Sequence, residues 1–168
     1  MIHRTNRTTR VVFILYGAIL IWIVLFKMAV SLTELQWLEG IRAINTQPFR
    51  YSIIDGRYPT TDSVLNVVIF IPLGVYLRML ERPLLRTILW GGLLSVAFEI
   101  CQYALAIGVA DVTDVITNTA GVAIGVCLYA LAHVIPIKRR RDATINTLSI
   151  IALAVLVGMT VVLHFTNR

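Results

Sequence analysis

Long runs of apolar residues, each interrupted by few polar ones, recur along the chain. Each run can cross the roughly 30 Å hydrocarbon core of a bilayer as a helix that rises about 1.5 Å per residue. The runs occupy residues 11–30, 64–80, 87–107, 115–137 and 148–165. This pattern predicts an all-α fold, namely a polytopic membrane helical bundle with five transmembrane helices.

The composition supports a membrane protein over a soluble one. Hydrophobic residues make up 58% of the chain and charged residues only 14%, whereas about a quarter of the residues in a soluble domain are charged. The mean hydropathy is +0.81. We see no internal repeat, and the loops are too short for a second folded unit. We therefore expect one transmembrane domain over residues 1–168.

The charge pattern orients the bundle. Basic residues gather before the first run, between the second and third, and between the fourth and fifth. They are Arg4, Arg7, Arg10, Arg78, Arg82, Arg86, Lys138, Arg139, Arg140 and Arg141. The positive-inside rule then predicts a cytoplasmic N-terminus and a C-terminus outside. The net charge of +6 thus reflects cytoplasmic loops and indicates no nucleic-acid partner. The first run lacks a small-residue cleavage site, so we expect it to be an uncleaved span.

The long connection between the first two runs, residues 31–62, contains frequent Leu, Trp and Ile. It either lies on the outer membrane surface and folds over the bundle, or forms a partly ordered loop. The two cysteines, Cys101 and Cys127, fall inside apolar runs and suit packing. Since no metal-ligand spacing or phosphate-binding loop is present, we expect no metal and no cofactor.

Polar residues within the spans are the candidates for function. An Asp at the centre of a membrane helix costs about 2.5–3.5 kcal/mol on insertion scales, and such groups usually face a bundle interior. On the third run, Ser95, Glu99 and Gln102 share one helical face. The candidate ligand-binding or functional cluster is Lys27, Asp62, Asn66, Glu99, Gln102, Asp111, Asp114 and Asn118. We expect these residues to converge on an outward-opening polar pocket, in which Glu99 faces residues of the second and fourth runs.

Structural roles are the alternative for each of these residues. Glu99 and Gln102 could hydrogen-bond between helices. Asp111 and Asp114 could cap the fourth helix at its N-terminus. Lys27 could extend to the membrane surface with no further role. The sequence leaves these alternatives open.

Other residues in the spans suit packing. Pro72 removes a helical hydrogen bond and predicts a kink in the second helix. Gly121 and Gly125 form a G-x-x-x-G step that permits close approach of another helix.

Five stretches, taken together and in order, resemble the VanZ family. They are "LIWIVLFK" (20–27), "INTQPF" (44–49), "DSVLNVVIFIPLG" (62–74), "FEICQYALAIG" (98–108) and "DVTDVITNTAG" (111–121). The family pattern falls on Lys27, Asn45, Pro48, Phe49, Asn66, Pro72, Gly74, Glu99, Gln102, Asp114, Asn118 and Gly121. We assign Gly74 to packing on this basis. Many relatives carry an Arg shortly after the Glu-x-x-Gln element, where this chain has Val109 and Ala110.

The resemblance implies low-level resistance to teicoplanin-type glycopeptide antibiotics, in the plasma membrane of a Gram-positive bacterium. It does not supply the chemistry. One hypothesis is binding of an outer-leaflet ligand, either the lipidated drug or a lipid-linked wall precursor, in the polar pocket. The other is an intramembrane enzyme in which Glu99 is the general acid or base, assisted by Asp114. Asn66, Asn118 and Lys27 would then orient the substrate. The oligomeric state stays open.

Overall fold

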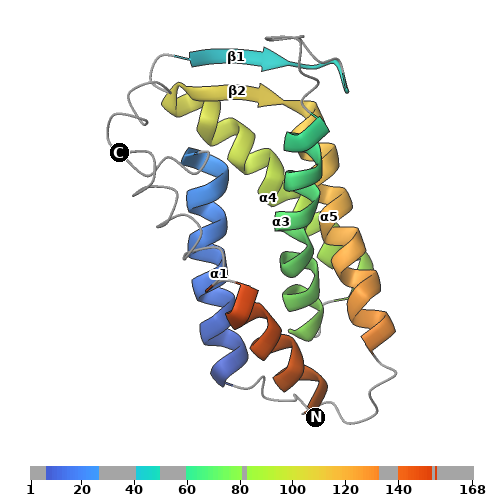
Figure 1. The fold of residues 1–168 in the computed structure, drawn as a ribbon. Coiled ribbons are helices and arrows are strands. Elements are labelled where there is room, and N and C mark those ends of the chain that lie inside the picture. The colour runs from blue at the N-terminus through green and yellow to red at the C-terminus, as the bar shows by residue number, and fades with distance from the viewer. Residues whose placement is uncertain are drawn as a thin grey trace.

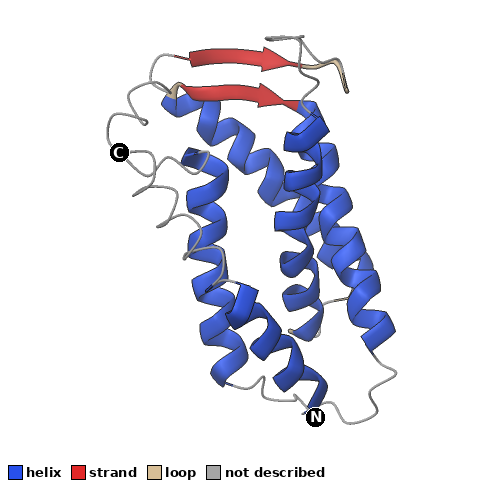
Figure 2. Ribbon diagram, in the orientation of Figure 1, coloured by secondary structure: helices blue, strands red, loops and turns tan. Residues whose placement is uncertain are grey.

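The computed structural model describes residues 7–26, 41–49, 60–80, 83–132, 140–152 and 154. The main helices are α1 (Arg7–Phe26), α3 (Thr60–Met79), α4 (Leu84–Leu105) and α5 (Val112–Leu131). A further helix occupies residues 140–152. The helices run up and down in one elongated bundle (Figures 1 and 2). The mostly helical prediction is therefore confirmed.

Four helices are long and apolar enough to cross a membrane, and they correspond to the first four predicted spans. The predicted boundaries need correction. Each observed helix begins three or four residues before the predicted run, because Thr and Arg flank the apolar stretches without ending the helix. The predicted fifth span at 148–165 lies largely outside the described residues, of which only 148–152 and 154 fall within it.

Two short strands correct the all-α prediction. β1 (Ile41–Asn45) and β2 (Ile107–Asp111) pair in parallel, from Ile41 opposite Ile107 to Asn45 opposite Asp111. They lie across one end of the bundle, where β2 connects the end of α4 to the start of α5 (Figure 1). Ile107, which we expected at the end of a span, is thus the first residue of a strand. Five extended residues reach about 16 Å, so β2 separates the ends of the two helices that it joins.

Helices α3 and α5 form the closest contact in the bundle. A Cβ atom at Gly74 would overlap the carbonyl oxygen of Val122. One at Gly121 would overlap that of Val67, and one at Gly125 would overlap that of Ile71. The absence of a side chain at these glycines lets the two backbones meet. The start of α5 is thereby fixed beside α3.

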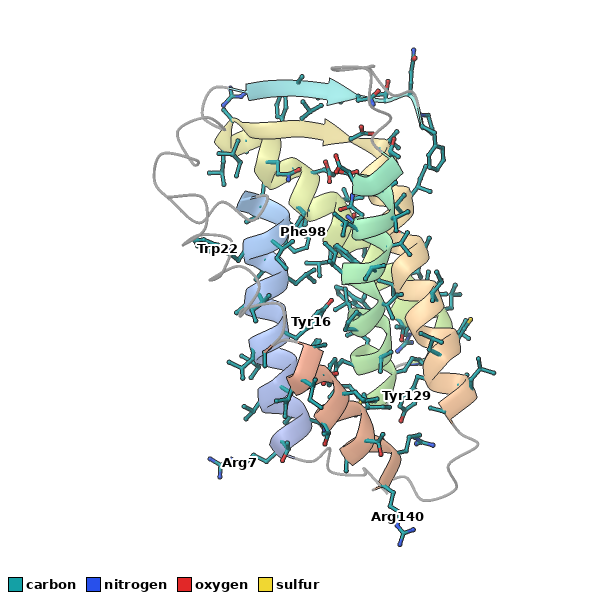
Figure 3. The ribbon with its side chains drawn as sticks, in the orientation of Figure 1. Arg7, Tyr16, Trp22, Phe98, Tyr129 and Arg140 are labelled. Carbon is teal, nitrogen blue, oxygen red and sulfur yellow. The ribbon has the colours of Figure 1, made fainter. Side chains whose placement is uncertain are left out.

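The apolar side chains divide between a small core and an exposed surface. Phe70, Tyr76 and Phe98 are buried between the helices, and Phe98 and Tyr16 lie inside the bundle in Figure 3. Many large apolar residues are instead exposed, among them Trp90 at 57%. In a soluble protein such a surface would be an association hazard, whereas in a bilayer it faces lipid. This distribution leaves the buried polar residues as the features that need an explanation.

Candidate functional site

The two ends of the bundle differ in their polar residues. Arg7 and Arg140 lie at the end of the bundle opposite the strands, and their side chains point outward from it (Figure 3). Arg78 in the last turn of α3 and Arg86 near the start of α4 belong to that same end by the direction of their helices. We call it the arginine end. The other end, under β1 and β2, contains most of the predicted cluster.

We define the strand-end cluster by the hydrogen-bonded polar residues at this second end. It draws on β1, α3, α4, β2 and α5. Its members are Asn45, Asn66, Ser95, Glu99, Gln102, Asp111, Thr113, Asp114 and Asn118.

Glu99 links α4 to the strand that follows it. Its side chain is 6% exposed, and Oε2 accepts a hydrogen bond of 2.8 Å from the backbone N–H of Asp111. This N–H is at the end of β2, directly before α5. One role of the carboxylate is therefore to fix the junction of β2 and α5 above the buried face of α4.

Asp111 ties three elements together and is the N-cap residue of α5. Its Oδ1 accepts a hydrogen bond of 2.7 Å from the backbone N–H of Thr113, as expected for an N-cap. Its Oδ2 accepts one of 2.9 Å from Asn45 Nδ2 at the end of β1. Both oxygens thus take part in joining β1, β2 and α5.

Two further pairs lie between the helices. Asn66 Nδ2 of α3 donates to Asp114 Oδ1 of α5 at 2.8 Å. Deeper in the bundle, Asn118 Nδ2 of α5 donates to Ser95 Oγ of α4 at 2.9 Å. Ser95 lies roughly 15 Å along α4 from the helix end at Leu105. The cluster therefore reaches from the strands to about the middle of the bundle.

Gln102 connects α4 to α1. Its Nε2 donates a hydrogen bond of 2.7 Å to the backbone carbonyl of Val24. Its Oε1 is buried and has no hydrogen-bond donor among the described residues, and the same holds for Asn118 Oδ1. Gln102 is only 3% exposed and Asn118 only 1%. Two buried acceptors of the cluster are thus without a donor from the described part of the chain.

The turn after β1 covers the edge of the cluster. Phe49 has a left-handed backbone with φ 56°, which is rare for a bulky residue. Its N–H donates to Thr113 Oγ1 at 3.1 Å, while Asn45 Oδ1 accepts the N–H of Gln47. The Phe49 side chain is 51% exposed. The turn is therefore held from both sides and presents an aromatic ring at the edge of the cluster.

Most predicted site residues come together, but not all. The structure places Asn66, Glu99, Gln102, Asp111, Asp114 and Asn118 toward this end, with Asn66 bonded to Asp114 and Glu99 to the Asp111 N–H. Asp62 lies exposed in the first turn of α3 and makes no side-chain hydrogen bond to a described residue. Lys27 is outside the described residues. Within the described ranges, no group of three or more His, Cys, Asp and Glu residues could hold a metal ion.

Sequence reasoning missed three contributors. Thr113 receives the Phe49 amide, and Ser95, noted only for its helical face, receives Asn118. Arg42 of β1 donates to the carbonyl of Ala104 at 3.1 Å and lies over the Tyr103 ring. The spacing of Ser95 from Glu99, one helical turn, was a usable signal. The roles of Arg42 and Thr113 depend on β1, which hydropathy does not reveal.

A second buried polar network lies toward the arginine end. Asn146 of the helix at 140–152 donates to Thr9 Oγ1 of α1 at 2.9 Å and accepts from the Tyr76 hydroxyl of α3 at 3.3 Å. Arg141 donates to the Tyr129 hydroxyl of α5 at 3.1 Å. These bonds join four helices. They attach the last described helix to the bundle.

Four helices are able to span a membrane, and a partly buried polar cluster lies at one end of them. These features define the class as an integral membrane protein built as a helical bundle. The chain belongs to the VanZ-like family, because the profile of the VanZ/LLP1 family matches residues 13–133. It is 35% identical over 144 residues to Protein VanZ of Enterococcus faecium, covering 84% of this chain and 86% of that protein. No solved structure matches the chain. The family resemblance stated from the five stretches is confirmed.

Proposed function

We propose that the chain confers low-level resistance to teicoplanin-type lipoglycopeptides by binding an outer-leaflet ligand in the strand-end cluster. The ligand is either the lipidated drug or a lipid-linked precursor of the cell wall. One observation carries the proposal: buried and half-buried carboxylates and amides from five elements gather at one end of a bundle with an apolar surface. Polar groups in membrane spans serve function by default. The family resemblance, and not the geometry of the cluster, indicates teicoplanin-type antibiotics.

The orientation follows from charge. Arg7, Arg78, Arg86 and Arg140 belong to the arginine end, so the positive-inside rule places that end at the cytoplasm. The strand-end cluster then opens toward the outer leaflet of the plasma membrane. A drug with a lipid tail and a lipid-linked precursor both present a polar head at that depth. The relative from Enterococcus faecium supports a Gram-positive host.

Site-directed photo-crosslinking tests the binding proposal. A benzophenone amino acid replaces Phe49 at the edge of the cluster, and in a matched control it replaces Trp90. Both are exposed aromatic residues, and Trp90 is near the opposite end of its helix. We expect position 49 to capture teicoplanin or a wall precursor in living cells, and position 90 to capture bulk phospholipid. Equal capture of the same species at both positions would contradict the proposal.

Intramembrane catalysis with Glu99 as general acid or base is the alternative. The structural role observed for Glu99 needs only a hydrogen-bond acceptor for the Asp111 N–H. A glutamine supplies that acceptor but cannot perform acid–base chemistry. We expect the Glu99→Gln variant to retain teicoplanin resistance, measured as the minimal inhibitory concentration at matched membrane abundance. Loss of resistance at equal abundance, together with unchanged capture of drug or precursor at position 49, would favour the enzyme instead.

A further inference from the structure

In the strand-end cluster, the amide donors are more completely paired than the amide acceptors. The amide N–H₂ groups of Asn45, Asn66, Gln102 and Asn118 each donate to an acceptor within the protein. Gln102 Oε1 and Asn118 Oδ1, in contrast, are buried acceptors without a donor among the described residues. A buried polar atom left unpaired costs about 1–3 kcal/mol. The cluster is therefore suited to a ligand that donates hydrogen bonds.

The orientation of the Gln102 amide is fixed by its partner. A backbone carbonyl can only accept, so the group that faces the Val24 oxygen must be the N–H₂ of Gln102. Oε1 is therefore the unpaired atom, and exchanging oxygen and nitrogen would bring two acceptors together. Asn118 is held against Ser95, which shares the α4 face of Glu99 and Gln102. Ser95, which accepts from Asn118, and Gln102 thus lie on either side of Glu99 along one face of α4.

The charge of the cluster points to the same kind of ligand. Asp111 contributes a carboxylate whose described partners, the Thr113 N–H and the Asn45 amide, are both neutral, while Arg42 is engaged with Ala104 and Tyr103. A phosphate would meet repulsion from this carboxylate, whereas an ammonium group would be attracted. We propose that Gln102 and Asn118 form a subsite for a hydrogen-bond-donating group, best supplied by a protonated amine, of the outer-leaflet ligand. The inference rests on the proposed function and names the chemistry of what binds.

Amphiphiles with one chain and different heads test the subsite. Full-length protein in phosphatidylcholine nanodiscs is titrated with dodecylammonium, dodecyltrimethylammonium and dodecyl phosphate, and affinity is obtained from the shift in thermal unfolding. Dodecylammonium can donate N–H hydrogen bonds, whereas dodecyltrimethylammonium carries the same charge but has no N–H. We expect dodecylammonium to bind with a Kd about tenfold lower than dodecyltrimethylammonium, and dodecyl phosphate to bind most weakly. Equal affinity for the two cations would overturn the subsite.

Variants assign the effect to the two amides. Gln102→Met and Asn118→Leu should remove the preference for dodecylammonium. Asn146→Leu removes an equally buried amide near the arginine end and should leave the preference intact. Asn118→Asp should increase affinity for dodecylammonium, because Ser95 can donate to the carboxylate while the negative charge attracts the amine. Retention of the preference in Gln102→Met and Asn118→Leu would contradict the assignment.

Two outcomes separate this inference from the proposed function. If the amphiphiles bind without discriminating donors while position 49 still captures drug or precursor, the proposed function stands and the subsite is wrong. If the amphiphiles bind without discriminating donors and position 49 captures neither drug nor precursor, the subsite and the proposed function are both wrong. Competition against dodecylammonium by teicoplanin, and separately by an undecaprenyl-linked wall precursor, identifies which carries the donor. If neither competes, the subsite does not serve the outer-leaflet ligand.

Discussion

At the strand end, some residues hold the elements together and others are the ones that we propose contact the ligand. Asp111 illustrates the structural role, because its two oxygens cap α5 and hold Asn45 of β1. Gln102 and Asn118 are the proposed ligand contacts, since each uses its amide nitrogen to join helices and leaves its oxygen without a donor from the described residues. Residues with a structural role, such as Asp111, hold the elements that carry Gln102 and Asn118. Substitutions should therefore separate stability from ligand binding.

Removing the cap should destabilise this end of the protein. We expect Asp111→Ala to lower the free energy of unfolding by about 1–3 kcal/mol, because it removes an N-cap and leaves Asn45 without an acceptor. Asp111→Asn should recover much of this loss, since its side-chain oxygen still accepts the Thr113 N–H. The measurement is reversible unfolding in detergent micelles. Equal stability of Asp111→Ala and the wild type would show that the observed cap contributes nothing.

At the scale of elements, the helices were predictable and the strands were not. Apolar runs identify α1, α3, α4 and α5 because lipid requires long uninterrupted helices. β1 and β2 have five residues each, and the Asn45–Asp111 bond joins positions 66 residues apart. No local pattern encodes such a pairing. Helical spacing correctly placed Glu99 toward the interior, but its Asp111 amide partner depends on where β2 runs.

The contact between α3 and α5 should be sensitive to the smallest added side chain. Gly121→Ala and Gly125→Ala each place a methyl group against a carbonyl oxygen of α3. We expect each to lower the free energy of unfolding by about 1–3 kcal/mol. Gly17→Ala on α1 is the matched control, because a Cβ there meets nothing within 4 Å. Its stability should stay equal or rise by up to about 1 kcal/mol. A similar loss in all three variants would exclude the close contact as the cause.

For the whole molecule, the two ends should face opposite sides of the membrane. Thr46 in the exposed turn after β1 and exposed Arg140 at the arginine end are replaced singly by cysteine, with Cys101 and Cys127 changed to alanine. We expect a membrane-impermeant maleimide to label position 46 in intact cells, and position 140 only after permeabilisation. The opposite pattern would invert the orientation and move the cluster to the cytoplasmic leaflet.

The central claim is that the strand-end cluster binds an outer-leaflet ligand. Native mass spectrometry tests it most directly, on protein purified in mild detergent from cells grown with and without teicoplanin. We predict that the wild type retains a bound mass equal to the drug or to a lipid-linked wall precursor. Asn118→Leu should lose this mass and Asn146→Leu should keep it. A wild-type protein that carries only bulk phospholipid, or an Asn118→Leu variant that retains the same ligand, would contradict the account.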